Sequence, residues 1–114
     1  MVAADAALQK KAENIVIIDL RPLSAFTDFF IICNARSEPQ MQAIVDHIEE
    51  KLLEKRIRMH HIEGIDKLKW VLMDYDDFVI HIFLPEVRSY YELEKMWGDT
   101  EKYIFDGKVR KSRI

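Results

Sequence analysis

The sequence predicts an α/β fold, a sheet with helices packed on it, in a single domain. Two kinds of segment alternate along the chain. Short runs of β-branched and aromatic residues are typical of strands that are covered on both faces. Segments in which apolar residues return every three or four positions are typical of helices with one buried side. At 114 residues, 49% of them hydrophobic, the chain is long enough to bury a core of its own.

The segment from Trp70 to Phe83 gives the clearest strand signal. Its two apolar runs, residues 70–73 and 78–83, are joined by four residues in which turn formers replace hydrophobic ones. This pattern predicts a β-hairpin inside the sheet, and the scarcity of polar residues in both runs predicts that each strand is covered on both faces. We expect Trp70, at the start of the first strand, and Tyr75, in the turn, to lie on an exposed contact surface. Trp97 falls on the apolar side of a later helix and is expected in the core.

Three further segments are predicted strands. Residues 15–18 and 29–33 are compact runs of β-branched and aromatic side chains. Residues 58–63 are more polar, so we expect this strand near an edge of the sheet. With the two strands of the hairpin, the sheet has about five strands.

Three helices are predicted around these strands. Residues 5–13 are strong helix formers with Asp5 as a cap. Ser37 and Gln40 have the spacing of a capping box and start a helix of about four turns. A last helix is expected over residues 84–98, between Leu84-Pro85 and Gly98. The apolar positions of the middle helix are Met41, Ile44, Val45, Ile48 and Leu52.

The composition predicts a soluble cytoplasmic protein. Cys33 is the only cysteine, so no internal disulfide is possible, which fits a reducing compartment. No apolar run approaches the roughly 18 residues of a membrane span, and the N-terminus lacks the hydrophobic region of a signal peptide. We therefore expect no membrane partner.

The charge is unevenly distributed along the chain. The net charge is −3, but the segment from Asp106 onward carries four cationic side chains against one carboxylate, so the rest carries −6. We divide the chain into a domain at residues 1–107 and a basic tail at 108–114, which we expect to be a frayed, solvated terminus. An acidic body disfavours broad contact with nucleic-acid phosphates and favours a basic protein partner. The tail could add a minor contact with RNA.

The sequence supports a catalytic function less well than a binding function. Asp74, Asp76 and Asp77 could hold a divalent ion beside a nucleotide, but no Gly-rich phosphate loop or Gly-Ser pair accompanies them. A metal-dependent nucleotidyltransferase-like enzyme is therefore the alternative reading. His60 and His61 are adjacent on a predicted strand, so they point to opposite faces and cannot chelate one metal ion together. We expect no catalytic residue, metal or cofactor.

Spaced motifs over residues 11–99 closely resemble those of the ribosomal silencing factor family, also called the iojap family. The matching pieces are Lys11 to Ile15, Thr27 to Phe30, Glu63-Gly64, Trp70, Asp74-Tyr75, Val79 to Phe83, Pro85-Glu86, Arg88, Tyr91 to Lys95, and Trp97 to Asp99. The resemblance implies a mixed sheet flanked by helices, similar to nucleotidyltransferases but without their catalytic motif.

The resemblance also implies a function. Members of the family are non-enzymatic factors that bind the large ribosomal subunit, chiefly through ribosomal protein L fourteen. They block association with the small subunit and lower translation when nutrients are short. Family members are often homodimers, so we expect a homodimer when the protein is free.

A set of partner-binding residues follows from the hairpin and the resemblance together. Trp70 is similar to the tryptophan with which the family faces its partner. The other residues expected around it are Lys69, Asp74, Tyr75 and His81 from the hairpin, and Tyr90, Tyr91 and Glu92 from the following helix.

Overall fold

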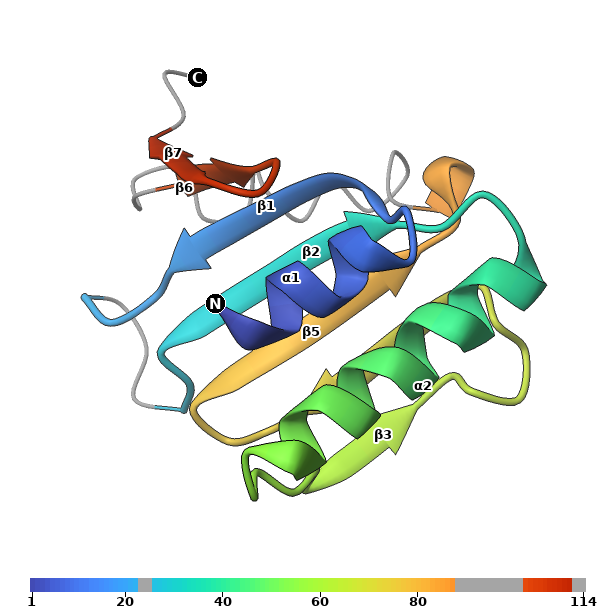
Figure 1. The fold of residues 1–114 in the computed structure, drawn as a ribbon, viewed down its shortest axis with the longest axis horizontal. Helices are drawn as coiled ribbons and strands as arrows, with labels where there is room; N and C mark the ends of the chain where they lie inside the picture. Colours follow the sequence, from blue (N-terminus) through green and yellow to red (C-terminus); the bar gives the residue numbers. More distant parts are fainter. Residues whose placement is uncertain (23–25, 88–101, 112–114) are drawn as a thin grey trace.

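The computed structural model describes residues 1–22, 26–87 and 102–111. In this part of the chain, two helices and seven strands form one α/β unit (Figure 1). The elements are α1 (Val2–Gln9), β1 (Glu13–Asp19), β2 (Phe29–Asn34), α2 (Glu38–Glu54), β3 (His61–Glu63), β4 (Trp70–Asp74), β5 (Phe78–Phe83), β6 (Lys102–Phe105) and β7 (Val109–Lys111). The predicted α/β fold with a single sheet is confirmed, with seven strands rather than about five.

The sheet is mixed, as expected. Its strand order is β3-β4-β5-β2-β1-β6-β7. Strands β2 and β5 pair in parallel at the centre, and every other pair of neighbours is antiparallel. Along the chain, β2 is connected to β5 by α2, β3 and β4. The predicted hairpin is confirmed as β4 and β5.

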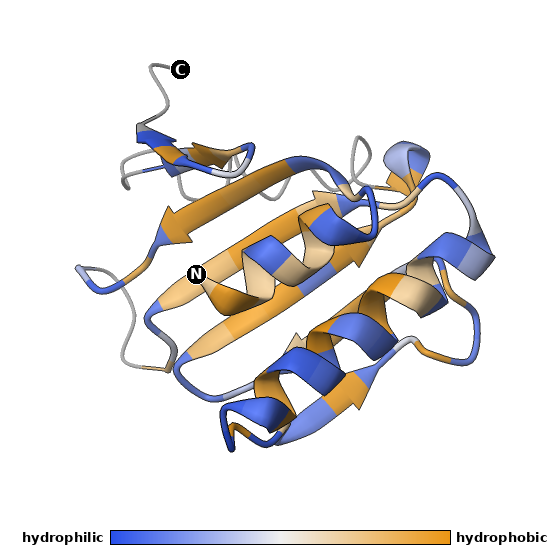
Figure 2. Ribbon diagram, in the orientation of Figure 1, coloured by the Kyte–Doolittle hydropathy of each residue, from blue (hydrophilic) through white to orange (hydrophobic). Residues whose placement is uncertain are grey.

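Both helices pack on the same face of the sheet (Figure 1). Helix α2 begins after Ser37, whose Oγ accepts a hydrogen bond from the Gln40 N–H at 3.2 Å, and Pro39 lies in its first turn. Figure 2 shows the resulting division of α2 into a hydrophobic side toward the sheet and a polar side away from it. The five apolar positions predicted for this helix are all buried: Met41, Ile44, Val45, Ile48 and Leu52.

Helix α1 lies earlier in the chain than predicted. It spans Val2–Gln9, so Asp5 lies inside its first turn rather than capping it. Lys11 has a φ of 65°, a left-handed conformation that no helix continues through. The buried side of α1 is built from small residues, which lets the helix approach the sheet closely: Ala3, Ala4, Ala6 and Ala7.

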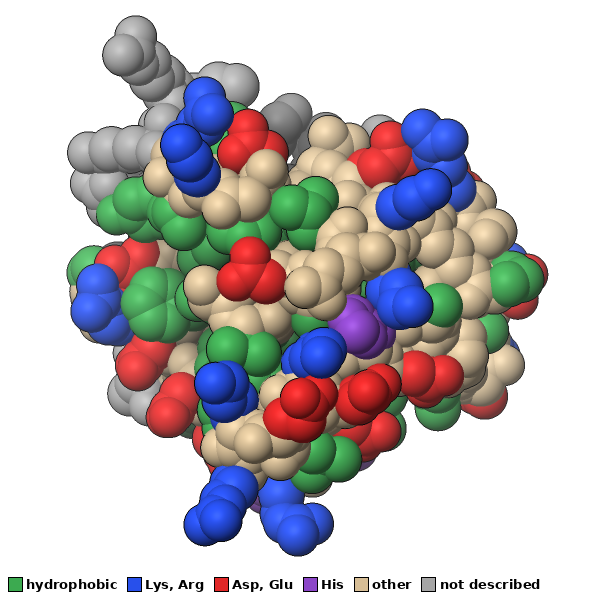
Figure 3. Space-filling model, viewed as in Figure 1, with side chains coloured by type: hydrophobic (Ala, Val, Ile, Leu, Met, Phe, Trp, Pro, Cys, Tyr) green, Lys and Arg blue, Asp and Glu red, His purple; other side chains and the backbone are tan. Residues whose placement is uncertain are grey.

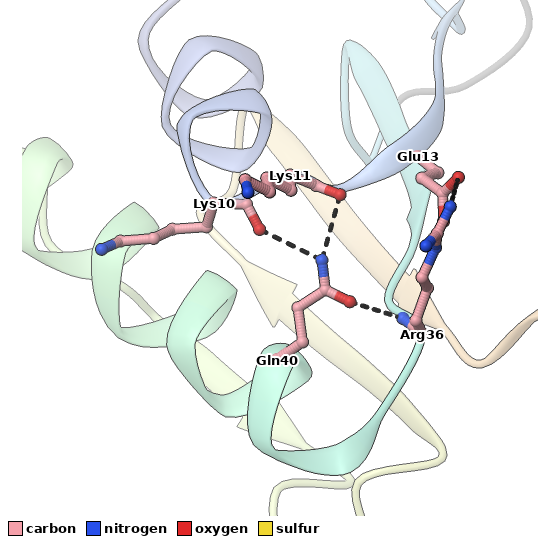
Figure 4. A network of polar contacts seen from close by, with 5 residues as sticks. All are labelled: Lys10, Lys11, Glu13, Arg36 and Gln40. Carbon is pink, nitrogen blue, oxygen red and sulfur yellow. Dashed lines mark hydrogen bonds and ion pairs between the residues drawn. The ribbon is translucent and has the colours of Figure 1, made fainter.

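A polar network joins the end of α1 to the start of α2 (Figure 4). The Gln40 side-chain amide donates to the carbonyl oxygens of Lys10 and Lys11 at 3.1 and 3.0 Å. Its carbonyl oxygen accepts the Arg36 N–H at 2.7 Å, and the Arg36 guanidinium also pairs with Glu13. Gln40 therefore satisfies carbonyl groups that the end of a helix leaves without partners.

The basic end of the chain is more ordered than predicted. Residues 109–111 form β7, which pairs with β6, and β6 pairs with β1 (Figure 1). The expectation of a frayed terminus is therefore wrong for these residues. Asp106-Gly107 lies between the two strands, and Gly107 has a φ of 108°, which only glycine adopts readily. The sheet thus gains two strands at this edge.

Two further predictions were a strand over residues 58–63 and a helix over residues 84–98. The strand predicted over residues 58–63 is shorter, because only β3 at His61–Glu63 pairs with β4, at the edge of the sheet. Residues 85–87 are helical, and the remainder of the helix predicted over 84–98, including Trp97, lies outside the described residues. In the described part of the chain, no helix is long and apolar enough to cross a membrane.

The side of the molecule that carries α1 and α2 has an ordinary solvated surface. Figure 3 shows charged side chains of both signs around smaller hydrophobic areas on this side. Beneath it, the helices and the sheet enclose the larger of two cores, which is mostly aliphatic. The second core lies on the opposite face of the sheet.

Candidate partner-binding surface

The hairpin of β4 and β5 places the candidate site on the face of the sheet opposite α1 and α2, called the far face below. In its register Trp70 pairs with Phe83, and Leu72 pairs with His81. Because successive side chains of a strand point to opposite faces, these four residues share one face. Val71 and Met73 point the other way and belong to the helix-covered core.

The alternation along β4 corrects one expectation. The first run of the hairpin was predicted to be covered on both faces, but Val71 and Met73 are buried while Trp70, Leu72 and Asp74 are only partly buried. The far-face side of β4 therefore reaches solvent. In β5, by contrast, both faces are buried from Ile80 to Phe83.

An aromatic cluster forms the far face at this point. The Trp70 ring stacks on Phe83, with 5.0 Å between centroids and 28° between planes. The His81 ring meets Phe30 of β2 edge to face at 4.6 Å. Phe83 is fully buried, whereas Trp70 keeps part of its ring exposed. Trp70 is thus a packed side chain with an accessible portion, which is typical of an interface anchor.

Trp70 and His81 are also joined by a hydrogen bond. The indole Nε1–H of Trp70 donates to Nδ1 of His81 at 3.1 Å. This bond requires Nδ1 to be unprotonated, so the neutral ring carries its proton on Nε2. Burial lowers the pKa of His81 to about 4, which keeps the ring neutral at neutral pH. Nε2 is buried and has no hydrogen-bond partner among the residues that the structure describes.

Tyr75 does not lie on an exposed contact surface, so that expectation is wrong. It is only 5% exposed and belongs to the helix-covered core, where its ring stacks on Phe78 at 5.1 Å. Burial, followed by the negative charge of Glu49, raises the pKa of Tyr75 to about 12. Tyr75 continues the alternation of Val71 and Met73, which places it on the face opposite Trp70.

Lys69 and Asp74 flank β4 at its two ends. Lys69 is exposed, and its carbonyl oxygen accepts the Leu84 N–H at 3.0 Å, which ties the start of β4 to the end of β5. Asp74 accepts the Asp76 N–H at 2.8 Å through Oδ1 and so shapes the turn. By the alternation of the hairpin, Trp70, Asp74 and His81 share the far face. Lys69 directly precedes β4, and its side chain is exposed. Tyr90, Tyr91 and Glu92 lie outside the described residues.

Gly64 fixes the approach of the chain to Trp70. It has a φ of 83°, and a Cβ at this position would collide with the carbonyl oxygen of Trp70. Only glycine combines this conformation with this contact.

Phe30 and Phe83 were not among the expected site residues. Strand alternation was the available signal for Phe83, whereas Phe30 depends on the pairing of β2 with β5.

Among the described residues, the turn carboxylates form no metal-binding group with their neighbours. Asp76 lies 3.9 Å from His60, measured from Oδ2 to Nδ1, and both side chains are exposed. Within the described ranges, no three His, Cys, Asp or Glu side chains are grouped so that they could hold a metal ion. The alternative enzymatic reading therefore gains no support from this region.

The fold and this surface define a small α/β domain whose candidate site is a packed aromatic patch on a sheet face. A crystal structure of a protein from Chromobacterium violaceum has the same fold, with a TM-score of 0.82 and 32% identity over 85% of this chain and 81% of that one. The sequence model of the family described as "Ribosomal silencing factor during starvation" matches residues 1–113.

Two relatives are similar over most of their length. The ribosomal silencing factor RsfS of Bacillus subtilis is 43% identical over 99 residues, which are 87% of this chain and 84% of that protein. The RsfS of Halalkalibacterium halodurans is 38% identical over 108 residues, which are 95% of this chain and 92% of that protein. The chain therefore belongs to the ribosomal silencing factor family, as its motifs indicated.

Proposed function

We propose that this protein binds the large ribosomal subunit and prevents the small subunit from joining it, which represses translation when nutrients are short. The docking partner is ribosomal protein L fourteen. Family membership supports a role at the ribosome. Steric exclusion needs a rigid domain on a shared interface and no reactive group.

The observation that carries the proposal is the partly exposed Trp70 within the far-face aromatic cluster. Its ring is backed by Phe83 and bonded to His81, so little conformational entropy is lost when a partner covers it. Tryptophan is among the residues most enriched in interface hot spots. Asp74 at the end of β4 supplies a carboxylate on the same face, and the exposed Lys69 directly precedes Trp70 in the chain.

Charge supports a basic protein as the main partner. The chain outside the basic C-terminal segment carries −6, so long-range attraction favours a cationic surface.

A second, minor contact with ribosomal RNA is proposed for the β6-β7 hairpin, where Lys108 and Arg110 are exposed. Charge-neutralising variants of these two residues should reduce the salt dependence of binding without abolishing it.

The free protein is proposed to be a cytoplasmic homodimer. Its mass in solution, measured by light scattering at several concentrations, tests this state. A strictly monomeric mass at high concentration would contradict it.

Subunit joining tests the main proposal. Purified small and large subunits are mixed with increasing amounts of the protein and separated on a sucrose gradient. We expect joined ribosomes to decrease and the protein to migrate with the large subunit. Undiminished joined ribosomes at saturating protein would reject the proposal.

A further inference from the structure

The partly exposed indole of Trp70 on the far face is held by a buried histidine. Trp70 and His81 lie on neighbouring strands but are not directly paired, because Trp70 pairs with Phe83 and His81 with Leu72. The hydrogen bond of 3.1 Å therefore runs diagonally across the hairpin. Phe83 stacks on the indole ring. The Trp70 side chain is therefore held at two places: the hydrogen bond holds Nε1, its only polar side-chain atom, and the stacking holds the ring.

We propose that His81 is a positioning residue for docking, which accepts the indole N–H so that Trp70 offers its ring and not its N–H to the partner. This inference rests on the proposed function of the far face. His81 is only 4% exposed, so it acts through Trp70 and does not itself reach the partner.

The hydrogen bond determines which chemistry Trp70 can recognise. An indole has one donor and no acceptor, so an indole whose N–H is already bonded presents only carbon and π surface. Such a surface binds the alkyl stem and charged head of a Lys or Arg side chain. It gives no hydrogen bond to a carbonyl or carboxylate group. Together with the charge of −6 on the chain outside its basic C-terminal segment, this surface favours a cationic side chain of the partner as the group that Trp70 contacts.

The protonation state of His81 is consistent with this role. The surroundings of the ring are apolar and aromatic, and burial is the cause that lowers its pKa to about 4. Nδ1 is therefore a permanent acceptor at neutral pH. The neutral ring leaves a buried Nε2–H without a partner among the described residues.

A double-mutant cycle tests whether His81 acts through the indole N–H. The variants are Trp70→Phe, His81→Phe and the combination, and the measurement is affinity for purified large subunits. Trp70→Phe keeps a ring, so we expect affinity within about threefold of wild type. His81→Phe leaves the N–H without its acceptor, and we expect affinity to decrease about tenfold. In the Trp70→Phe background the same change should matter less than about twofold.

A conservative variant and a spectroscopic measurement complete the test. His81→Asn keeps an acceptor, its Oδ1, and should restore most of the affinity lost in His81→Phe. Nitrogen NMR of the wild-type protein should show Nδ1 unprotonated and Nε2 protonated. This measurement needs no variant, so it still tests the hydrogen bond if His81→Phe fails to fold.

Three outcomes would overturn the inference. Equal effects of His81→Phe in both backgrounds would mean that the indole N–H is not involved, and a proton on Nδ1 would exclude the bond itself. A Trp70→Phe variant as weak as Trp70→Ala would mean that the N–H contacts the partner. If Trp70→Ala binds normally while Nδ1 is an acceptor, the proposed docking surface fails and the hydrogen bond stands.

Discussion

The two faces of the β-sheet differ in what their side chains do. The helix-covered face is filled mainly by aliphatic residues that pack between the sheet and the helices α1 and α2. At β4 and β5 the far face instead carries aromatic rings and a buried histidine. Aliphatic packing contributes stability without polar atoms to satisfy. The far face instead holds a partly exposed tryptophan by ring stacking and a hydrogen bond, an arrangement suited to binding.

Neighbouring residues of β4 allow the sharpest test of this difference. Met73 is fully buried in the helix-covered core, while Leu72 is partly exposed on the far face. We expect Met73→Ala to lower the free energy of unfolding by about 2–5 kcal/mol, because it leaves a cavity. Leu72→Ala should cost about 1 kcal/mol, because its side chain is already partly in water. Urea unfolding measures both, and equal losses would remove the distinction.

Acid titration probes the buried histidine of the far face. The folded pKa of His81 is about 4, below its ordinary value of 6.5. Between these values the unfolded chain binds a proton that the folded chain does not, so stability is lost as pH falls through this range. The loss attributable to His81 reaches about 3 kcal/mol at the acid end.

His81→Asn provides the control for that loss, since asparagine does not titrate. The free energy of unfolding of wild type and variant is measured from about pH 7 to pH 4. Other groups contribute to both curves: Arg21, for example, lowers the pKa of Asp19 by hydrogen bonding. Only the difference between the curves reports His81, and parallel curves would show that His81 does not resist protonation.

Gln40 gives the smallest of the three stability effects. Its side chain makes three hydrogen bonds, two of which tie the chain at the end of α1 to α2, while the third accepts the Arg36 N–H just before α2. We expect Gln40→Ala to cost about 1–2 kcal/mol. Within the described part of the chain, the Gln42 side chain bonds only to Asp46, one turn further along α2, so Gln42→Ala should cost about 0.5 kcal/mol. If the two variants were equally stable, the network would not contribute to helix docking.

Local patterns were sufficient to predict the centre of the fold. The β-branched runs at 15–18 and 29–33, the Ser37 cap and the hairpin all correspond to observed elements, because each is specified by residues close in sequence. The strands at the basic end were missed. Their charged residues suggested a solvated tail, although Asp106-Gly107 is a dipeptide typical of hairpin turns.

The candidate site was predictable only in part. Trp70 could be singled out from its position before an apolar run, but Tyr75 was assigned to the turn although β4 alternation places it with Met73. The Trp70-His81 bond depends on the register of two strands, and the contact with Phe30 depends on a parallel pairing. No local pattern specifies either one.

The central claim is that the far face at Trp70 binds the large ribosomal subunit. The direct measurement is the affinity of Trp70→Ala for purified large subunits, beside Leu53→Ala, which removes an exposed apolar side chain from α2. With both variants folded by circular dichroism, we expect Trp70→Ala to bind at least about 30-fold more weakly and Leu53→Ala to bind as wild type. A folded Trp70→Ala variant that binds as tightly as wild type would contradict the account.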